Sequence, residues 1–114
     1  MNISKSNRIV LQKILNEISI VNEMTMRYTK EEFLNDNIAQ RAIAMTIINI
    51  GELTTVFPDD FRQAYSQIPW RKIKGLRNII AHKYEIVDFE DVWETATTSV
   101  PELEKHLFEI LKSS

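Results

Sequence analysis

The amino-acid sequence predicts an all-α fold, an antiparallel four-helix bundle with short extra helical turns. Its 114 residues suit one domain, since a single hydrophobic core usually serves about 100–150 residues. Only two glycines and three prolines occur, which is few for the turns of a sheet, whereas apolar residues recur three and four positions apart over long segments. We therefore expect residues 1–114 to form a single helical domain without repeats or linkers.

Composition excludes several classes of protein. Cysteine is absent, which excludes disulfide scaffolds, cysteine-ligated zinc sites and a cysteine nucleophile. No apolar run approaches the ~20 residues needed to cross a membrane, and the first residues lack the apolar region of a signal peptide. A cytoplasmic protein that does not act at a membrane is therefore expected.

The first helix is expected over residues 5–24, with Ser4 or Ser6 as its N-cap. Apolar side chains follow one side of this segment at helical spacing, namely Val10, Leu11, Ile14, Leu15, Ile18 and Val21. After a short polar connection, Thr29 precedes two acidic residues. A capping hydroxyl followed by acids predicts the start of a further, short helix.

The long helix that follows is predicted to be central. It starts at Asp36 or Asn37 and ends near Val56, because the residue before Pro58 disfavours helical backbone angles. It carries two apolar stripes, one of Ile43, Ile47 and Ile50 and the other of Ile38, Ala42, Met45 and Leu53. A helix that is apolar on two sides packs on the core and can also face a partner subunit. A short helical turn over residues 59–66 is expected next.

Proline and cap signals define the remaining helices. Pro69 begins a third main helix, whose apolar residues are Trp70, Ile73, Leu76, Ile79 and Ile80. Gly75 inside it costs ~1 kcal/mol relative to alanine, which we interpret as a close approach of two helices. The last helix starts at Asp88, with Asp91 placed as in a capping box. Pro101 should kink this helix or split it in two.

Charge is distributed unevenly along the chain. The net charge is −2, yet residues 61–84 carry six basic and no acidic side chains, whereas residues 85–114 carry eight acidic and two basic ones. One interpretation is a solvated helix face beside an acidic segment. The other interpretation is a local site for an anionic ligand such as phosphate.

The basic segment contains Arg77 and His82, a pair that can support metal-independent cleavage of RNA. Histidine titrates near neutrality and can move a proton, and the guanidinium of arginine matches phosphate oxygens. The 2′-hydroxyl of RNA can serve as the nucleophile. On a helix the two side chains lie ~140° apart, so the helix ends near Ala81, Arg77 reaches around it, or a second copy of the chain completes the site.

Plainer interpretations of the same residues stay open. A histidine at a helix end often interacts with the helix dipole or packs through a hydrogen bond. Asn78 lies one turn before His82 on the same face, where it would be an ordinary surface residue. Tyr84 would then lie at the rim of the core, and Glu52 would be a solvated side chain.

Several segments together resemble the HepT-like branch of the HEPN superfamily, which comprises toxins encoded beside a small nucleotidyltransferase antitoxin of the MntA type. These segments are Ile50-Gly51-Glu52, Ile68-Pro69-Trp70, Ile73-Lys74-Gly75-Leu76-Arg77-Asn78, His82-Lys83-Tyr84, Val87-Asp88, Val92-Trp93 and Pro101-Glu102-Leu103. The resemblance covers about residues 38–107, and it departs mildly at Leu76, where Met is common. It implies a HEPN-type helical bundle.

The resemblance also implies a homodimer with a composite ribonuclease cleft, in which Arg77 and His82 of both chains are catalytic and Asn78 supports the site. It further implies that the partner nucleotidyltransferase attaches AMP to Tyr84. An anionic phosphodiester at Tyr84 would neutralise the basic cleft and block RNA. ATP and Mg²⁺ then belong to the partner, and this chain is expected to need neither a metal nor a cofactor.

Two hypotheses of function follow. The first is a toxin that cleaves RNA as a metal-independent endonuclease, with His82 as general acid–base and Arg77 as the stabiliser of the phosphate. Lys74, Lys83 and Tyr84 are expected to support RNA binding beside them. The alternative is a non-catalytic nucleotide- or protein-binding helical module that acts with a nucleotidyltransferase partner.

Overall fold

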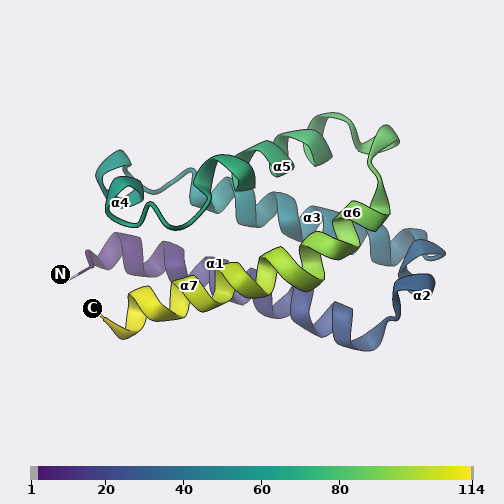
Figure 1. Ribbon diagram of the computed structural model, residues 1–114, viewed down its shortest axis with the longest axis horizontal. Coiled ribbons are helices and arrows are strands. Elements are labelled where there is room, and N and C mark those ends of the chain that lie inside the picture. The colour runs from purple at the N-terminus through teal and green to yellow at the C-terminus, as the bar shows by residue number, and fades with distance from the viewer. Residues whose placement is uncertain (1–2, 114) are drawn as a thin grey trace.

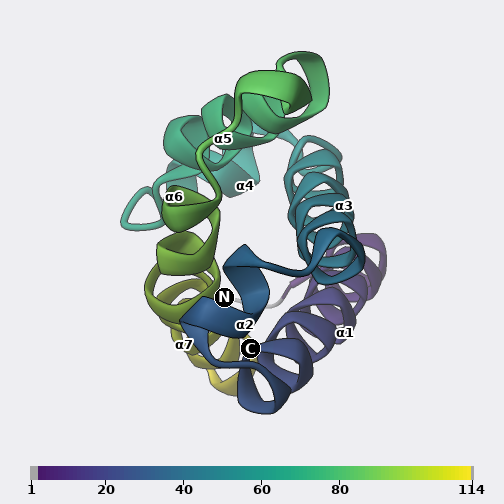
Figure 2. The ribbon, with the colours of Figure 1, turned by 90° about the vertical axis from the view of Figure 1, so that its right-hand side faces the viewer.

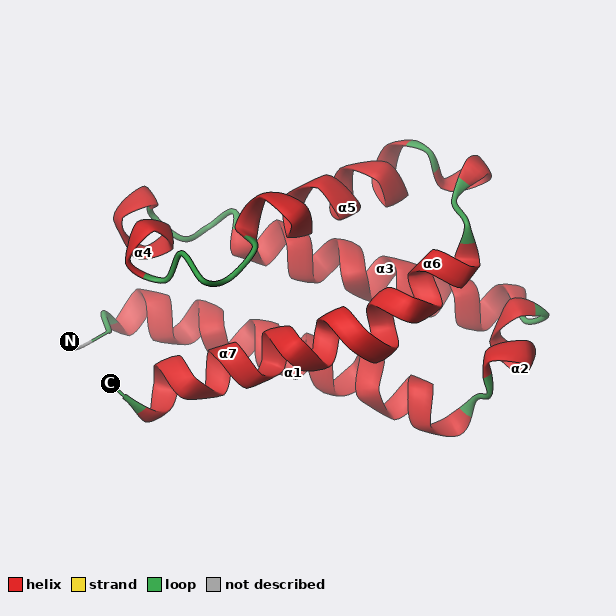
Figure 3. Cartoon of the chain, viewed as in Figure 1, coloured by secondary structure: helices red, strands yellow, loops and turns green. Residues whose placement is uncertain are grey.

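The computed structural model describes residues 3–113, which form an antiparallel helical bundle (Figure 1). The main helices are α1 (Lys5–Arg27), α3 (Asn37–Thr54), α5 (Trp70–His82) and α7 (Val100–Lys112). Short elements join them, namely α2 (Lys30–Leu34), α4 (Asp59–Ala64), the 3₁₀ turn η1 (Tyr84–Ile86), α6 (Phe89–Glu94) and the π-helical turn η2 (Thr95–Ser99). The described residues contain no strand (Figure 3), which confirms the all-α prediction.

The main helices run alternately in opposite directions, so α1 begins at the end of the molecule where α7 finishes (Figure 1). Helix α1 packs between α3 and α7, whereas α5 packs mainly on α3 (Figure 2). The buried apolar side chains of α1 and α7 are Leu11, Ile14, Ile18, Val21, Val100, Leu103, Leu107 and Ile110. In α5 only Ile80 is fully buried. Helix α5 therefore lies at the margin of the core.

Side-chain caps start the first three helices where the sequence predicts them. The Ser4 hydroxyl accepts a hydrogen bond from the Asn7 N–H, which makes Ser4 the cap of α1. Thr29 and Glu32 form a complete capping box at α2. The Asp36 carboxylate accepts the Ala39 and Ile38 N–H groups at α3, and these bonds, that of Ala39 foremost, hold the pKa of Asp36 below its ordinary value.

Helix α3 has the two apolar sides that the sequence predicts. Ile43, Ile47 and Ile50 are buried in the core. On the other side Ile38 is 81% exposed and Met45 is 58% exposed, so this side keeps apolar surface that the chain itself does not cover. Even so, no helix within residues 3–113 is both long enough and apolar enough to cross a membrane.

The close approach between helices occurs at Gly51 of α3, not at Gly75 as the sequence analysis predicted. A Cβ built on Gly51 would lie 2.4 Å from the Arg77 Cβ and 2.8 Å from its Cγ, whereas a Cβ on Gly75 would have nothing within 4 Å. The interpretation of Gly75 was wrong because a glycine inside a helix permits a close contact but does not show that a neighbour makes one. Only Gly51 lets α5 lie directly against α3.

Pro101 does not split the last helix. The chain continues from α6 through the widened turn η2 into α7, and Pro101 falls in the first turn of α7. The Val100 N–H donates to the Thr95 carbonyl, one residue further back than in an α-helix. This π-helical turn is a local distortion that accommodates the missing N–H of a proline. At the start of α6, Asp88 caps the Glu90 N–H.

Candidate active site

Arg77 lies in the joint between α5 and α3. Its stem presses on the backbone of Gly51, and its guanidinium Nη1 lies 3.3 Å from Oε1 of Glu52 on α3. The Arg77 side chain is 16% exposed, whereas that of Glu52 is 56% exposed. Arg77 Nε is buried and has no hydrogen-bond partner among the described residues. The structure thus fixes Arg77 at one place and gives it one anionic neighbour.

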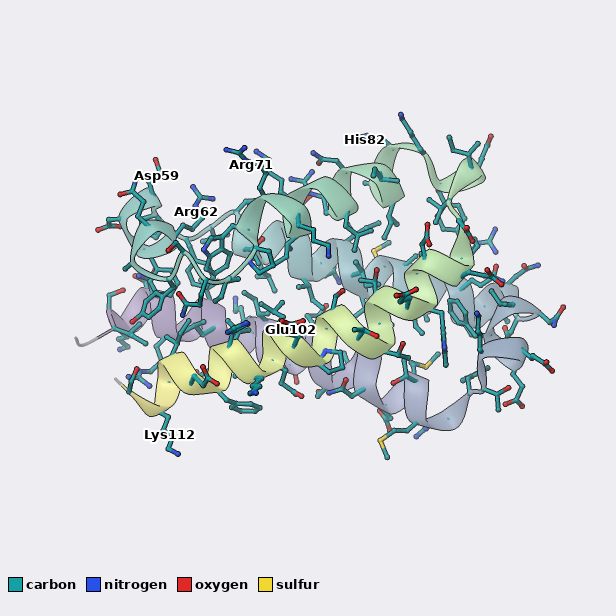
Figure 4. The ribbon with its side chains drawn as sticks, in the orientation of Figure 1. Asp59, Arg62, Arg71, His82, Glu102 and Lys112 are labelled. Atoms are coloured by element: carbon teal, nitrogen blue, oxygen red, sulfur yellow. The ribbon has the colours of Figure 1, made fainter. Side chains whose placement is uncertain are left out.

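His82 lies on a different side of the same helix. It is the last residue of α5 and is exposed, and it stands with Arg71 on the outer edge of the bundle (Figure 4). Helix α5 ends at His82, one residue past the predicted end near Ala81, and the chain turns at Lys83. Arg77 packs onto α3 instead of reaching around α5. Completion of the site by a second copy stays a prediction.

Tyr84 lies just past α5, in the turn η1, and is half-buried. Its ring meets the edge of Phe89 at 5.6 Å between centroids, and the Arg41 guanidinium carbon lies 5.7 Å from its centroid. Arg41 was not predicted as a site residue, because it lies on α3, outside the basic segment, and no local spacing connects it with Tyr84. The fold adds this cation to the site.

The basic segment is divided by the fold. Asn78 is half-buried, and Lys83 is exposed at the C-cap of α5. Lys74 is exposed and lines a broad depression of about 1000 Å³ where α3, α4 and α5 meet. Further cations of this depression are Arg62, Arg71 and Lys72, of which Arg62 pairs with Asp59. Positive charge therefore extends from the start of α5 along its exposed side.

A second cavity lies on the opposite side of α5, between α5 and α7. Its volume is about 510 Å³, and its lining is mostly apolar. His106 of α7, the second histidine of the chain, is part of this lining, and its Nδ1 is buried without a hydrogen-bond partner among residues 3–113. Neither Arg77 nor His82 nor Tyr84 lines this cavity, so it is separate from the candidate site.

The described part of the chain holds no group of three or more His, Asp or Glu side chains arranged to bind a metal ion. The charged groups that the fold brings together at Arg77 are its own guanidinium and the Glu52 carboxylate. That neither metal nor cofactor is needed stays a prediction.

The fold is an antiparallel helical bundle, and the family that it belongs to follows from comparison of its sequence with known protein families. The family model described as "Ribonuclease HepT-like" matches residues 14–110. The chain belongs to the HepT-like ribonuclease family.

Relatives of similar length support this assignment. The protein named "Putative RNase TTE0752" from Caldanaerobacter subterraneus subsp. tengcongensis is 35% identical over 95% of this chain and 96% of its own length. "Probable ribonuclease HepT" from Thermococcus cleftensis is 32% identical over 95% of this chain and 97% of its own length. No solved structure matches the chain significantly.

Proposed function

We propose that this protein is the toxin of a toxin–antitoxin pair and acts in the cytoplasm as a metal-independent RNA endonuclease. The observation that carries the proposal is the Arg77–His82 pair on α5 of a HepT-like chain. Membership of a ribonuclease family supports the substrate class. The positive charge on the exposed side of α5 supports binding of a polyanion.

The reaction needs a base, a cation and an acid. A base removes the proton of the 2′-hydroxyl, the 2′-oxygen attacks phosphorus, and the bond from phosphorus to the 5′-oxygen breaks as an acid protonates that oxygen. Arg77 stabilises the charge that develops on the phosphate, and His82 moves protons. Asn78, Lys74 and Lys83 support RNA binding. The products are a 2′,3′-cyclic phosphate and a 5′-hydroxyl.

The proposal includes a homodimer with composite sites. In one chain Arg77 faces α3 whereas His82 faces outward, so one site needs Arg77 from one copy and His82 from the other. The exposed Ile38 and Met45 on α3 provide apolar surface for a two-fold contact.

Mixing two inactive variants tests the composite site. Arg77→Ala and His82→Ala chains are each expected to lose cleavage. After subunit exchange, a mixed dimer has one intact site, so an equal mixture should recover up to about a quarter of the original activity. If dimers that are shown to be mixed do not recover activity, the sites are not composite. If both single variants cleave as fast as the original protein, the catalytic assignment is wrong. Activity abolished by EDTA contradicts the metal-free mechanism.

The antitoxin part of the proposal concerns Tyr84. A partner nucleotidyltransferase of the MntA type, using its own ATP and Mg²⁺, would attach AMP to the Tyr84 hydroxyl. The phosphodiester would neutralise nearby cations and obstruct RNA, and the Arg41 guanidinium beside the ring supports an anion at this position. Intact mass after co-expression with the partner tests this, with Tyr84→Phe as the control. An unchanged mass of the original chain contradicts it.

The alternative function is a nucleotide- or protein-binding module that does not cut. The separation of Arg77 from His82 within one chain favours it, because a single copy presents cations for binding without a neighbouring proton donor. Binding of a defined RNA without turnover, by protein free of its partner, is the result that would select this alternative.

A further inference from the structure

Glu52 is the acidic group that the fold places beside Arg77. Glu52 directly follows Gly51 in the sequence, and Gly51 is the residue that lets α5 lie against α3. The missing Cβ brings the Arg77 stem onto α3, and the guanidinium then reaches Glu52 Oε1 at 3.3 Å. The sequence alone gave no reason to connect these residues, which are 25 positions apart.

Burial differs between the two members of this ion pair. The Arg77 side chain is mostly enclosed, with 16% exposed, whereas 56% of the Glu52 side chain is open to solvent. The Glu52 carboxylate is therefore the more accessible member of the pair for an RNA substrate. Half-exposed ion pairs contribute little to stability, so folding alone is a weak reason for a carboxylate at this position.

We propose that Glu52 is the general base of RNA cleavage. This inference rests on the proposed ribonuclease function: it assigns the base to Glu52 and leaves His82 as the acid. Cleavage needs a base next to the phosphate-binding cation. His82 of the same chain is exposed at the end of α5 (Figure 4), whereas Arg77 packs onto α3. The group that the structure does place beside Arg77 is a carboxylate.

In the proposed step, a Glu52 carboxylate oxygen takes the proton of the 2′-hydroxyl. The 2′-oxygen then forms a bond to phosphorus, while Arg77 stabilises the charge on the phosphate oxygens. The bond between phosphorus and the 5′-oxygen breaks, and the leaving oxygen takes a proton from the imidazolium of His82 on the second copy. Glu52 then returns its proton to water, and His82 regains one.

The first experiment compares Glu52→Gln, Glu52→Asp and Glu109→Gln in the full-length protein, with a defined RNA as substrate. Glu52→Gln is expected to lower the single-turnover rate about 100-fold or more, with RNA affinity within about threefold of the original. Glu52→Asp keeps a carboxylate and should retain part of the rate. Glu109, exposed on α7, gives the same loss of charge away from Arg77 and should cleave normally.

The second experiment separates a base from an acid. An RNA with sulfur in place of the scissile 5′-oxygen has a leaving group that needs no proton donor. His82→Ala is expected to recover most of its rate on this substrate, whereas Glu52→Gln stays slow. If Glu52 only oriented Arg77, the Glu52→Gln variant would keep its cleavage rate, because the side-chain oxygen of glutamine still accepts a hydrogen bond from Arg77.

The outcomes are distinguishable from failure of the proposed function. Full activity of Glu52→Gln, or its rescue by the sulfur substrate to the same extent as His82→Ala, overturns the general base while Arg77 and His82 keep their assignments. Faster cleavage by Glu52→Gln also overturns it and makes the carboxylate a competitor of RNA for Arg77. If the original protein does not cleave, the function and this inference fail together.

Discussion

The two sides of α5 differ in how closely they are packed. On one side the Arg77 stem lies so near α3 that a Cβ on Gly51 would stand 2.4 Å from the Arg77 Cβ. On the other side Gly75 has open space around it and borders the 510 Å³ cavity between α5 and α7. The chain's own packing therefore fixes the position of Arg77, while it leaves the cavity side loosely specified.

This difference shows that the two glycines inside helices have different structural surroundings. Each glycine lowers helix stability by ~1 kcal/mol relative to alanine. At Gly51 the chain gains the contact that holds Arg77 beside Glu52. At Gly75 no contact among residues 3–113 accounts for the residue. Substitutions on the Gly51 side should therefore change both stability and cleavage, whereas those on the cavity side should change stability alone.

The largest effect is expected from Gly51→Ala. The new methyl group would overlap the Arg77 stem, and overpacking of this kind costs about 1–3 kcal/mol, more than the ~1 kcal/mol that alanine gains within a helix. We expect a lower urea midpoint and a loss of cleavage, because Arg77 must move. A variant that keeps both its midpoint and its activity would show that α5 can shift freely on α3.

His106→Leu is expected to have an intermediate effect on stability and to stabilise the protein, in contrast to Gly51→Ala. The buried Nδ1 of His106 has no partner among the described residues, and an unsatisfied buried polar atom costs about 1–3 kcal/mol. Leucine removes this atom and adds apolar contact to the cavity lining, so the thermal midpoint should rise while the cleavage rate stays constant. A lower midpoint would contradict the unpaired state of Nδ1 in solution.

The smallest effect is expected from Gly75→Ala, the matched control for Gly51→Ala. The methyl group meets nothing within 4 Å, and alanine stabilises a helix interior by about 0.5–1 kcal/mol over glycine. Urea denaturation should show this gain, with unchanged cleavage by the full-length protein. A loss of activity or of dimer would instead show that the bare backbone at Gly75 serves a contact outside the single chain.

Local signals predicted the helices well. Ser4, Thr29 and Asp36 each accept a hydrogen bond from an N–H two or three residues ahead. The starts of these helices can therefore be predicted from short stretches of sequence. The same holds for the ~140° between Arg77 and His82, which follows from helix geometry. In the structure Arg77 packs onto α3, whereas His82 is exposed at the end of α5.

Contacts between distant segments were not predictable from one sequence. Gly51 meets Arg77, Glu52 pairs with Arg77, and Arg41 covers the ring of Tyr84. Each contact depends on how α3 and α5 are placed relative to one another, and no local periodicity records that placement. The prediction for Gly75 failed for this reason.

Helix α5 packs mainly on α3, and this has a consequence for local unfolding. Detaching α5 exposes little of the core that α1 and α7 bury, so a local opening of α5 should need less free energy than global unfolding. Amide protons of α5 should then exchange with solvent before those of α1. Arg77 and His82 therefore lie on a unit that opens readily, whereas Glu52 lies on α3. A ligand that binds only the closed form would protect α5 by mass action.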